Sequence, residues 1–227
     1  MAMQEIKLTK KIQLTEDVFE LHYDFWYEVD MKPWQFITFI LPGIGGRSYS
    51  ILEKDKNTVK LTVKKRPSEK WGRGGSVFLC DAEVWTVFKA VWPAGHFVLH
   101  ENDDNKFFIG TGTGVVPLYN QIISALESGV TYEIKLVFWV RIKMDLFYID
   151  ILEKLSIKYP NFSFTICISR EDVEGYERWY VTNSISKEVV KAFQEFYLCG
   201  MPSMIDSCID TLKELWVTEE KIFFERY

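Results

Sequence analysis

The sequence predicts an α+β chain of two domains: an N-terminal antiparallel β-barrel or sandwich and a C-terminal α/β domain with a parallel sheet. Residues 1–100 hold short β-rich runs at close spacing, broken by Gly, Pro and Asp, which is typical of antiparallel barrels and sandwiches. From Phe107 onward, apolar runs typical of buried strands alternate with segments of helical periodicity, which indicates a parallel sheet. The polar stretch 101–106 separates the two patterns, so we expect domains at residues 1–102 and 103–227.

Each expected element follows from its local pattern. In the first domain we expect strands at residues 7–14, 18–23, 36–41, 58–65 and 86–91, where β-branched and aromatic residues concentrate. In the second we expect a strand entering at Phe107 and further strands at 134–140, 162–168, 196–199 and 221–224. Apolar residues at helical spacing predict helices at 145–159 and 204–215.

The composition limits the functional classes. The net charge is −5 and acidic and basic residues are mixed, so no basic surface for nucleic acid is expected. No apolar run approaches the ~20 residues that span a bilayer. The N-terminus lacks the apolar core of a signal peptide, so we expect a cytoplasmic protein. The cysteines form no C-x-x-C pair, so we expect this chain alone to build no iron–sulfur or zinc site.

Residues 107–117 carry the most informative single motif. Gly110, Gly112 and Gly114 alternate after an apolar run, and Pro117 opens an expected helix. A helix N-terminus behind a loop without side chains suits a phosphate. A plain strand–turn–helix connection is the alternative, but three alternating glycines exceed what a turn needs, so we favour a ligand-binding loop. The spacing differs from the G-x-G-x-x-G fingerprint of dinucleotide-binding proteins.

Two segments of the first domain are candidate binding sites. Arg47-Ser48-Tyr49-Ser50 follows a glycine-rich stretch, and by itself it is also consistent with a solvated strand edge. Residues 72–76, Gly-Arg-Gly-Gly-Ser, would offer backbone N–H groups and a hydroxyl to a phosphate. Residues 93–97 are expected to form a tight turn into a final barrel strand.

The second domain holds four further motifs at expected strand ends. Phe138-Trp139-Val140-Arg141 precedes Asp145, which is a candidate helix N-cap. Ser169-Arg170 follows the next strand, and the planar fork of arginine matches phosphate oxygens. Cys199 lies in Cys-Gly-Met-Pro-Ser-Met, although a lone cysteine at a strand end is usually a small core residue. The sequence then ends in Glu225-Arg-Tyr227, where fraying would be usual.

In this order and at comparable separations, the motifs resemble those of the ferredoxin–NADP reductase superfamily. The family patterns are R-x-Y-S/T, G-x-x-S, G-P-x-G-x-F, G-T-G-x-x-P and C-G-x-P-x-M, and the resemblance covers nearly the whole chain. It implies a flavin-binding β-barrel, with FAD favoured over FMN but the choice left open, and an α/β domain that binds NADPH or NADH.

The resemblance also implies a role for each matching residue on the flavin side. Arg47 would meet the flavin phosphates, Tyr49 would lie against the isoalloxazine, and Ser50 would hydrogen-bond near its N5. The residues implied to contact flavin are Arg47, Ser48, Tyr49, Ser50, Val63, Lys65, Gly74, Gly75, Ser76 and Tyr227.

On the nucleotide side, the resemblance places Cys199 beside the reacting nicotinamide carbon and Glu225 near the hydride path. Ser169 and Arg170 resemble a pair that some NADPH-dependent members place on the 2′-phosphate. The residues implied to contact the nucleotide are Gly110, Thr111, Gly112, Thr113, Gly114, Pro117, Arg141, Ser169, Arg170, Cys199, Gly200 and Pro202. Ser50, Cys199 and Glu225 are the implied catalytic residues.

The implied function is a flavoprotein oxidoreductase that passes hydride from NAD(P)H to a bound flavin and electrons onward. The implied acceptor is a separate protein, such as a ferredoxin, a flavodoxin or an oxygenase component. Two alternatives stay open: a reductase of free flavin, and an electron-transfer subunit without turnover of its own.

Six tryptophans stand where the family patterns have glycine. They are Trp34, Trp85, Trp92, Trp139, Trp179 and Trp216. Glycine supplies positive φ at turns and helix ends and lets a ligand approach the backbone, and tryptophan does neither. One hypothesis is that UGA codons, which some bacterial genetic codes read as glycine, were translated as tryptophan in this sequence. The alternative is that all six are genuine tryptophans.

Overall fold

The computed structural model describes residues 3–28, 30–32, 34–67, 69 and 72–227. The chain divides into two compact units, Met1–Val98 and Leu99–Tyr227. The division into independently folding domains near residue 102 stays a prediction. In the described residues no helix is both long and apolar enough to cross a lipid bilayer.

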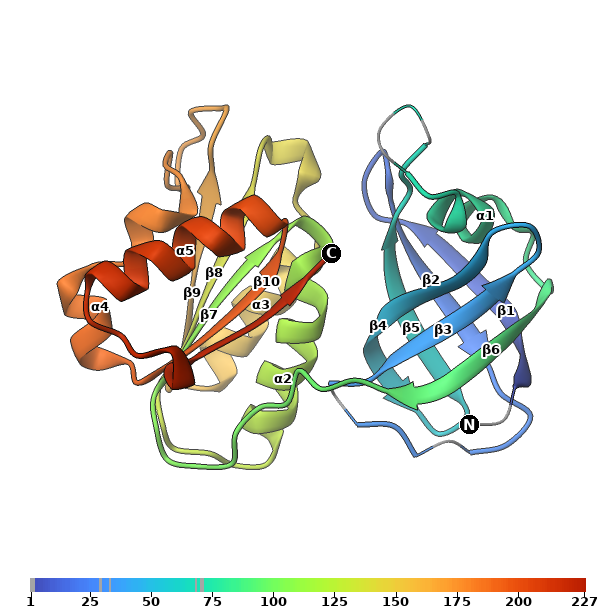
Figure 1. Ribbon diagram of the computed structural model, residues 1–227, viewed down its shortest axis with the longest axis horizontal. Helices are drawn as coiled ribbons and strands as arrows, with labels where there is room; N and C mark the ends of the chain where they lie inside the picture. The colour runs from blue at the N-terminus through green and yellow to red at the C-terminus, as the bar shows by residue number, and fades with distance from the viewer. Residues whose placement is uncertain (1–2, 29, 33, 68, 70–71) are drawn as a thin grey trace. The chain divides into compact units, whose positions relative to one another are not determined.

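The first unit is a closed antiparallel barrel with the strand order β1-β2-β5-β4-β3-β6, in which β6 pairs with β1 (Figure 1). Its strands are β1 (Gln4–Gln13), β2 (Val18–Asp24), β3 (Phe36–Leu41), β4 (Gly45–Asp55), β5 (Thr58–Lys64) and β6 (Val87–Ala94). A short helix, α1 (Gly75–Asp81), connects β5 to β6. The predicted barrel is therefore confirmed.

Aromatic side chains fill the barrel. Tyr23, Phe39 and Phe88 are buried, and their ring centroids lie 5.0 to 5.8 Å apart in tilted or edge-on pairs. Such pairs stabilise a core beyond the area that they bury. Strand alternation explains the pattern, because every second residue of these strands points inward.

The second unit is a parallel sheet, as predicted, and its strand order is β11-β10-β7-β8-β9 (Figure 1). Its strands are β7 (Lys106–Thr111), β8 (Ile134–Val140), β9 (Phe162–Ile168), β10 (Glu195–Gly200) and β11 (Ile222–Arg226). Its helices are α2 (Val115–Glu127), α3 (Ile149–Lys158), α4 (Lys187–Ala192) and α5 (Pro202–Glu214). The buried side chains of α5 and the partly buried Val189 and Val190 of α4 pack against one face of the sheet, and α2 and α3 lie on the other face.

Three local expectations differ from the structure. The helix expected from Asp145 begins only at Ile149, because Tyr148 adopts a φ of 61° and Asp145 ends a separate 3₁₀ turn. Asp145 is therefore not its N-cap. The expected turn at residues 93–97 does not lead into a barrel strand, since β6 runs through to Ala94 and closes the barrel. Strand β4 and helix α4 were not predicted.

A buried ion pair lies at the amino edge of the parallel sheet. Lys106, the first residue of β7, is 0% exposed, and its Nζ lies 3.3 Å from Oε2 of Glu195, the first residue of β10. Asn102 accepts a 2.7 Å hydrogen bond from Lys106 and donates one of 2.8 Å to Glu195. The Tyr197 hydroxyl donates to Glu195 at 2.8 Å. The buried charges are therefore paired and hydrogen-bonded, as their desolvation requires.

We expect the substitution Glu195→Gln to lower the free energy of unfolding by about 3 kcal/mol, because it leaves the Lys106 ammonium buried without its anion. Burial alone would raise the pKa of Glu195, but hydrogen bonds from Asn102 and Tyr197 and the Lys106 charge outweigh it, so the pKa lies below 4.5. A carboxyl whose pKa is lower in the folded than in the unfolded state stabilises the fold at pH values above its unfolded-state pKa. This contribution is lost as the pH falls through the folded-state pKa. The difference between wild type and variant should therefore shrink below pH 4.5.

Urea unfolding at several pH values measures this difference. The matched control is Glu53→Gln, which breaks the more exposed 2.7 Å pair with Lys60 and should cost less than about 1 kcal/mol. Equal losses in the two variants would contradict the stabilising role of the buried pair.

Candidate functional site

The carboxyl ends of the parallel strands meet at one edge of the second unit, where most of the predicted nucleotide contacts lie (Figure 1). Cys199 on β10 pairs in register with Gly110 on β7 and with Glu225 on β11. Thr111 pairs with Trp139 on β8. Residues from motifs far apart in the sequence are thus neighbours across the sheet, which is where open α/β sheets bind their ligands.

The loops that follow β7 and β10 interlock. A Cβ on Gly114 would lie 2.4 Å from the carbonyl oxygen of Cys199, and one on Gly200 would lie 2.0 Å from the Thr111 hydroxyl. That hydroxyl accepts a 3.3 Å hydrogen bond from the backbone N–H of Met201. Both glycines are therefore required by close approach within the chain itself. Met201 was not among the predicted contacts, although its position inside the Cys-Gly-x-Pro motif was a signal for it.

Two helix N-termini reach the same edge. The 3₁₀ turn Gly112–Gly114 leads from β7 into α2, whose N-cap is Gly114, and Met201 is the N-cap of α5. Neither cap makes a side-chain hydrogen bond to its helix. Pro117 lies in the first turn of α2 and Pro202 is the first residue of α5, where a missing N–H costs little. Uncapped N–H groups and two positive dipole ends make this edge favourable for an anion.

Two arginines stand at the adjacent strand ends. Arg141 follows β8 and Arg170 follows β9, and the Arg170 N–H donates to the Arg141 carbonyl at 2.9 Å. Both side chains are exposed, and Ser169 between β9 and Arg170 is half-buried. Arg141 Nη2 lies 3.8 Å from the Met201 sulfur, which brings it to the loop after β10. Exposed guanidinium groups beside uncapped helix termini suit a ligand with several phosphates.

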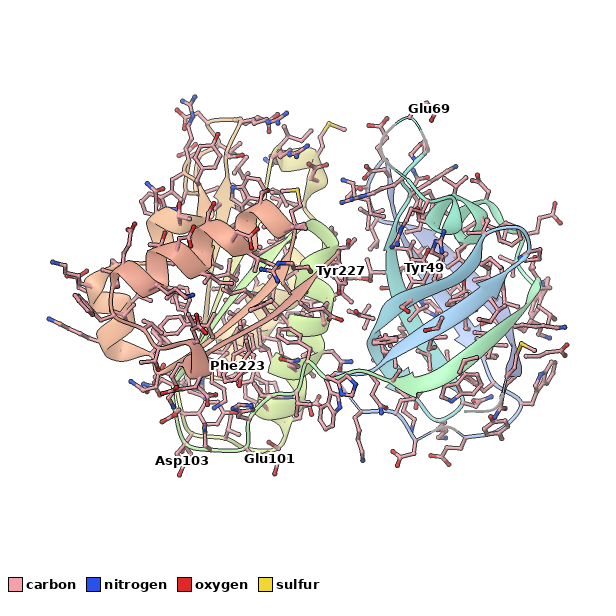
Figure 2. The ribbon with its side chains drawn as sticks, in the orientation of Figure 1. Tyr49, Glu69, Glu101, Asp103, Phe223 and Tyr227 are labelled. Atoms are coloured by element: carbon pink, nitrogen blue, oxygen red, sulfur yellow. The ribbon has the colours of Figure 1, made fainter. Side chains whose placement is uncertain are left out.

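Cys199 and Glu225 lie side by side with modified acidities. Cys199 is 0% exposed, and burial, together with the charge of Glu225, raises the pKa of its thiol well above the usual value. Burial also raises the pKa of Glu225. Tyr227, whose N–H donates to the Gly200 carbonyl at 3.1 Å, hydrogen-bonds the thiol and opposes part of the shift (Figure 2). The thiol of Cys199 is therefore neutral and is not a nucleophile. The hydrogen bond from its N–H to Gly200 holds Tyr227 against the sheet.

In the barrel, β4 presents the predicted Arg47–Ser50 motif. Arg47 and Tyr49 alternate with Ser48 and Ser50, so the two pairs point to opposite faces of the strand. A Cβ on Gly75 would lie 2.5 Å from Arg47 Cγ and 2.9 Å from the Tyr49 hydroxyl. The start of α1 thus packs directly on this motif, and only glycine fits there. Burial raises the pKa of Tyr49, so its phenol stays neutral.

The Arg47 guanidinium is only partly satisfied. Its Nη1 donates to the Gly46 carbonyl at 2.7 Å and its Nη2 to the Arg73 carbonyl at 3.1 Å. Its Nε is buried without a hydrogen-bond partner among the described residues. Gly74, with a φ of 79°, precedes α1 and leaves no side chain beside the motif. An unpaired cationic N–H next to a glycine cradle fits a phosphate-bearing group such as the one that a flavin carries.

The other predicted flavin contacts have different surroundings. Val63 is 1% exposed in the barrel core, and Lys65 forms an ion pair with Asp81. The Ser76 hydroxyl accepts the Arg66 N–H at 3.0 Å, and that of Ser48 lies 2.9 Å from the Thr38 hydroxyl. Ser50 is half-buried and pairs in register with Phe36. Arg47, Tyr49 and Gly75 thus form the compact part of the predicted flavin site, and Val63 lies inside the core.

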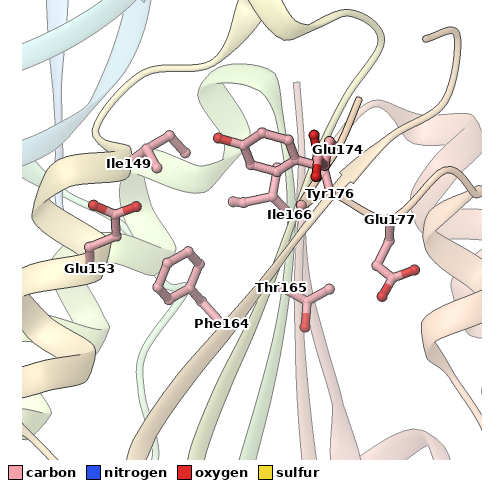
Figure 3. A pocket seen from close by; sticks show the side chains of 9 residues that line it. Ile149, Glu153, Phe164, Thr165, Ile166, Glu174, Tyr176 and Glu177 are labelled. Atoms are coloured by element: carbon pink, nitrogen blue, oxygen red, sulfur yellow. The ribbon is translucent and has the colours of Figure 1, made fainter. Parts of the chain in front are cut away.

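A separate pocket of about 480 Å³ lies against the edge strand β9, between α3 and residues 174–177 (Figure 3). Glu153, Glu174 and Glu177 line it together with apolar and aromatic side chains, and the described residues of its lining include no Lys or Arg. Carboxylates repel phosphates, so this pocket does not suit the ligand that the carboxyl edge favours.

Comparison with known proteins agrees with this geometry. Residues 108–210 match the family model of the oxidoreductase NAD-binding domain. The toluate 1,2-dioxygenase electron transfer component of Pseudomonas putida is 26% identical over 86% of this chain and 58% of its own length. One subunit of the Na⁺-translocating NADH-quinone reductase of Neisseria meningitidis serogroup B is 30% identical over 93% of this chain and 55% of its own length.

The family match and the reductase relatives support the assignment of this chain to the ferredoxin–NADP reductase superfamily. Solved structures show the same fold. An Amycolatopsis cytochrome P450 reductase superposes with a TM-score of 0.88 at 21% identity, covering 99% of this chain and 70% of the other. The ferredoxin–NADP⁺ reductase of Plasmodium falciparum, solved with 2′P-AMP, gives 0.79 at 20% identity over 98% and 95% of the two chains. The chain spans 55–58% of the length of the toluate dioxygenase component and the quinone reductase subunit.

We expect Gly114→Ala to destabilise the second unit by about 3 kcal/mol, because the new methyl group would overlap a backbone carbonyl that cannot move without distorting β10. The φ of Gly114 is −63°, so alanine adds no backbone strain and the cost is purely steric. Thermal and urea unfolding measure it.

Gly46→Ala is the matched control, since its Cβ would meet nothing closer than 3.4 Å and Gly46 has no positive φ. It should change stability by less than about 0.5 kcal/mol. A Gly114→Ala variant as stable as this control would show that the two loops are not in tight contact.

Proposed function

We propose that the protein is an NAD(P)H-dependent flavoprotein reductase that passes electrons to a separate acceptor protein. The observation that supports this most directly is the row Gly110–Cys199–Glu225 across the carboxyl edge of the sheet, flanked by two uncapped helix N-termini. The phosphate cradle at Arg47 and Gly75 on the barrel supports a second cofactor, FAD in this proposal. A cytoplasmic location, where reduced nicotinamide nucleotides are available, is part of the proposal.

The flavin, when bound, supplies the redox chemistry by accepting hydride from the reduced nicotinamide and releasing electrons to the acceptor. The residues of this chain bind and orient. Gly112, where an added Cβ would meet nothing within 4 Å, leaves the N-terminus of α2 open to a phosphate, while Gly110 and Gly114 allow the close packing within the chain that shapes this loop. Arg141 and Arg170 add positive charge at the same edge. Arg47 and Ser76 hold the flavin phosphates, and Tyr49 lies against the ring system.

Cys199 and Glu225 complete the proposed hydride-transfer site. The Cys199 thiol is buried just inside this edge, where as a neutral group it does not act as a nucleophile. Burial raises the pKa of Glu225, whose carboxyl is proposed to lie near the hydride path. Ser50 is proposed to hydrogen-bond near flavin N5.

The proposed acceptor is a ferredoxin, a flavodoxin or an oxygenase component. Several curated relatives support this choice by name, among them the reductase component DmpP of the phenol 2-monooxygenase of Pseudomonas sp. strain CF600. The ferredoxin–NAD(P)⁺ reductase component of the naphthalene 1,2-dioxygenase system of Pseudomonas putida is another, 26% identical over 94% of this chain.

The purified protein is expected to be yellow with one flavin per chain, and NADPH is expected to bleach that flavin faster than NADH because Ser169 and Arg170 favour a 2′-phosphate. Absorbance spectra, cofactor release and stopped-flow reduction with each nucleotide measure this. A colourless protein that reduces added flavin would instead support a free-flavin reductase. A flavin-bearing protein that oxidises neither nucleotide would support an electron-transfer subunit.

Ser50→Ala is expected to slow flavin reduction at least tenfold while the flavin stays bound, since one lost transition-state hydrogen bond corresponds to roughly 1.4 kcal/mol or more. Stopped-flow reduction and the flavin content of the purified variant test this together. Ser163→Ala, at an exposed position on β9, is the control and should reduce at the wild-type rate. An unchanged rate in Ser50→Ala would remove Ser50 from the mechanism.

A further inference from the structure

Two tryptophans have a backbone conformation that belongs to glycine. Trp85 has a φ of 81° and Trp216 a φ of 66°. Among the described residues only four that are not glycine have a positive φ, and these two tryptophans are half of them, although tryptophan supplies 8 of the 227 residues. A bulky residue in the left-handed region is strained, because its Cβ crowds the backbone carbonyl.

Trp216 occupies the position after a helix end that most requires glycine. Helix α5 ends at Glu214 with Leu215 as its C-cap, so Trp216 is the C′ residue. Its N–H donates to the Lys213 carbonyl at 3.0 Å, and the N–H of Val217 donates to the Leu212 carbonyl at 3.0 Å. These two bonds define a Schellman motif, whose C′ residue is usually glycine. The Trp216 side chain is 92% exposed, so packing does not compensate for the strain.

Trp85 stands in a turn with the same requirement. The Thr86 N–H donates to the Glu83 carbonyl at 3.1 Å, which closes a four-residue turn with Trp85 at its third position. A positive φ at that position alone defines a type II turn, which requires glycine or asparagine there. The indole is 65% exposed, and the Lys7 ammonium lies 5.0 Å from its ring centroid.

Trp139 adds an observation of a different kind. Its side chain is 8% exposed at the carboxyl end of β8, and its Nε1 is buried without a hydrogen-bond partner in the described part of the chain. Buried indole N–H groups usually have a partner. By contrast, Trp179 donates to the Cys167 sulfur at 3.1 Å and Trp92 packs edge-on against Phe25, so their surroundings accommodate an indole.

We propose that the natural polypeptide carries glycine at positions 85 and 216, encoded by UGA codons that its organism reads as glycine, and that Trp139 has the same origin. The positive φ values, the turn type and the Schellman hydrogen bonds support glycine at positions 85 and 216 independently of any sequence pattern. The proposal does not depend on the redox function, because it concerns the backbone alone.

The test compares glycine with alanine at each position. Both Trp216→Gly and Trp216→Ala remove the indole, but only glycine relieves the left-handed backbone. We expect the Trp216→Gly variant to melt about 2–4 °C higher than the Trp216→Ala variant. At position 85 the glycine variant should likewise melt higher than the alanine variant. Trp26, 66% exposed and without a positive φ, is the control: Trp26→Gly should melt no higher than Trp26→Ala. Equal melting temperatures for the glycine and alanine variants at positions 85 and 216 would overturn the structural part of the proposal.

The genetic part has its own readout. Peptide mass spectrometry of the protein isolated from its source organism should find glycine at positions 85, 139 and 216, and the gene should carry TGA there. Tryptophan in those peptides, or TGG codons, would overturn the recoding whatever the melting temperatures are.

Discussion

The contact between the loops after β7 and β10 constrains the whole second unit. Two peptide segments approach so closely that a single methyl group on Gly114 or Gly200 would overlap the opposite loop. This contact fixes the register of β7 relative to β10. Because β8, β9 and β11 pair in register with these strands or their neighbours, their alignment follows from it. The starts of α2 and α5 follow directly from the two loops, so both helix dipoles point to the same edge. The glycines of these two loops are therefore needed both for the packing of the sheet and for the proposed binding site.

The barrel uses glycine in a related way. Gly75 lets α1 begin directly on Arg47 and Tyr49, and the Arg47 Nε is buried without a hydrogen-bond partner among the described residues. An unsatisfied cationic donor is unfavourable in the protein alone. Binding a phosphate there would remove this penalty, so the cost in the free protein becomes part of the affinity for the ligand.

The sequence predicted the two-part architecture and the clustering of the nucleotide motifs, because parallel strands place every strand-end motif at one edge. It failed where local chemistry competes with periodicity. Strand β4 begins Gly-Gly-Arg-Ser, which carries no apolar alternation, and α4 has only six residues. The start of α3 was misplaced because Asp145 is a good N-cap by residue type, whereas the chain turns at Tyr148. Nothing in the sequence pattern alone revealed the unsatisfied Arg47 Nε, which depends on side-chain placement.

The buried pair of Lys106 and Glu195 has a consequence for building chimeric proteins. Its hydrogen-bonded cluster includes Asn102 from the segment that precedes β7, and the His100 N–H donates to the Tyr197 hydroxyl at 3.1 Å. In a chimera joined after residue 102, positions 100 and 102 would come from the protein that supplies the barrel. Lys106 and Glu195 would then lose the hydrogen bonds of Asn102 unless that protein has the same residue there. Exchange of barrels between relatives is best made upstream of Leu99, so that the segment from residue 99 to 106 travels with the parallel sheet.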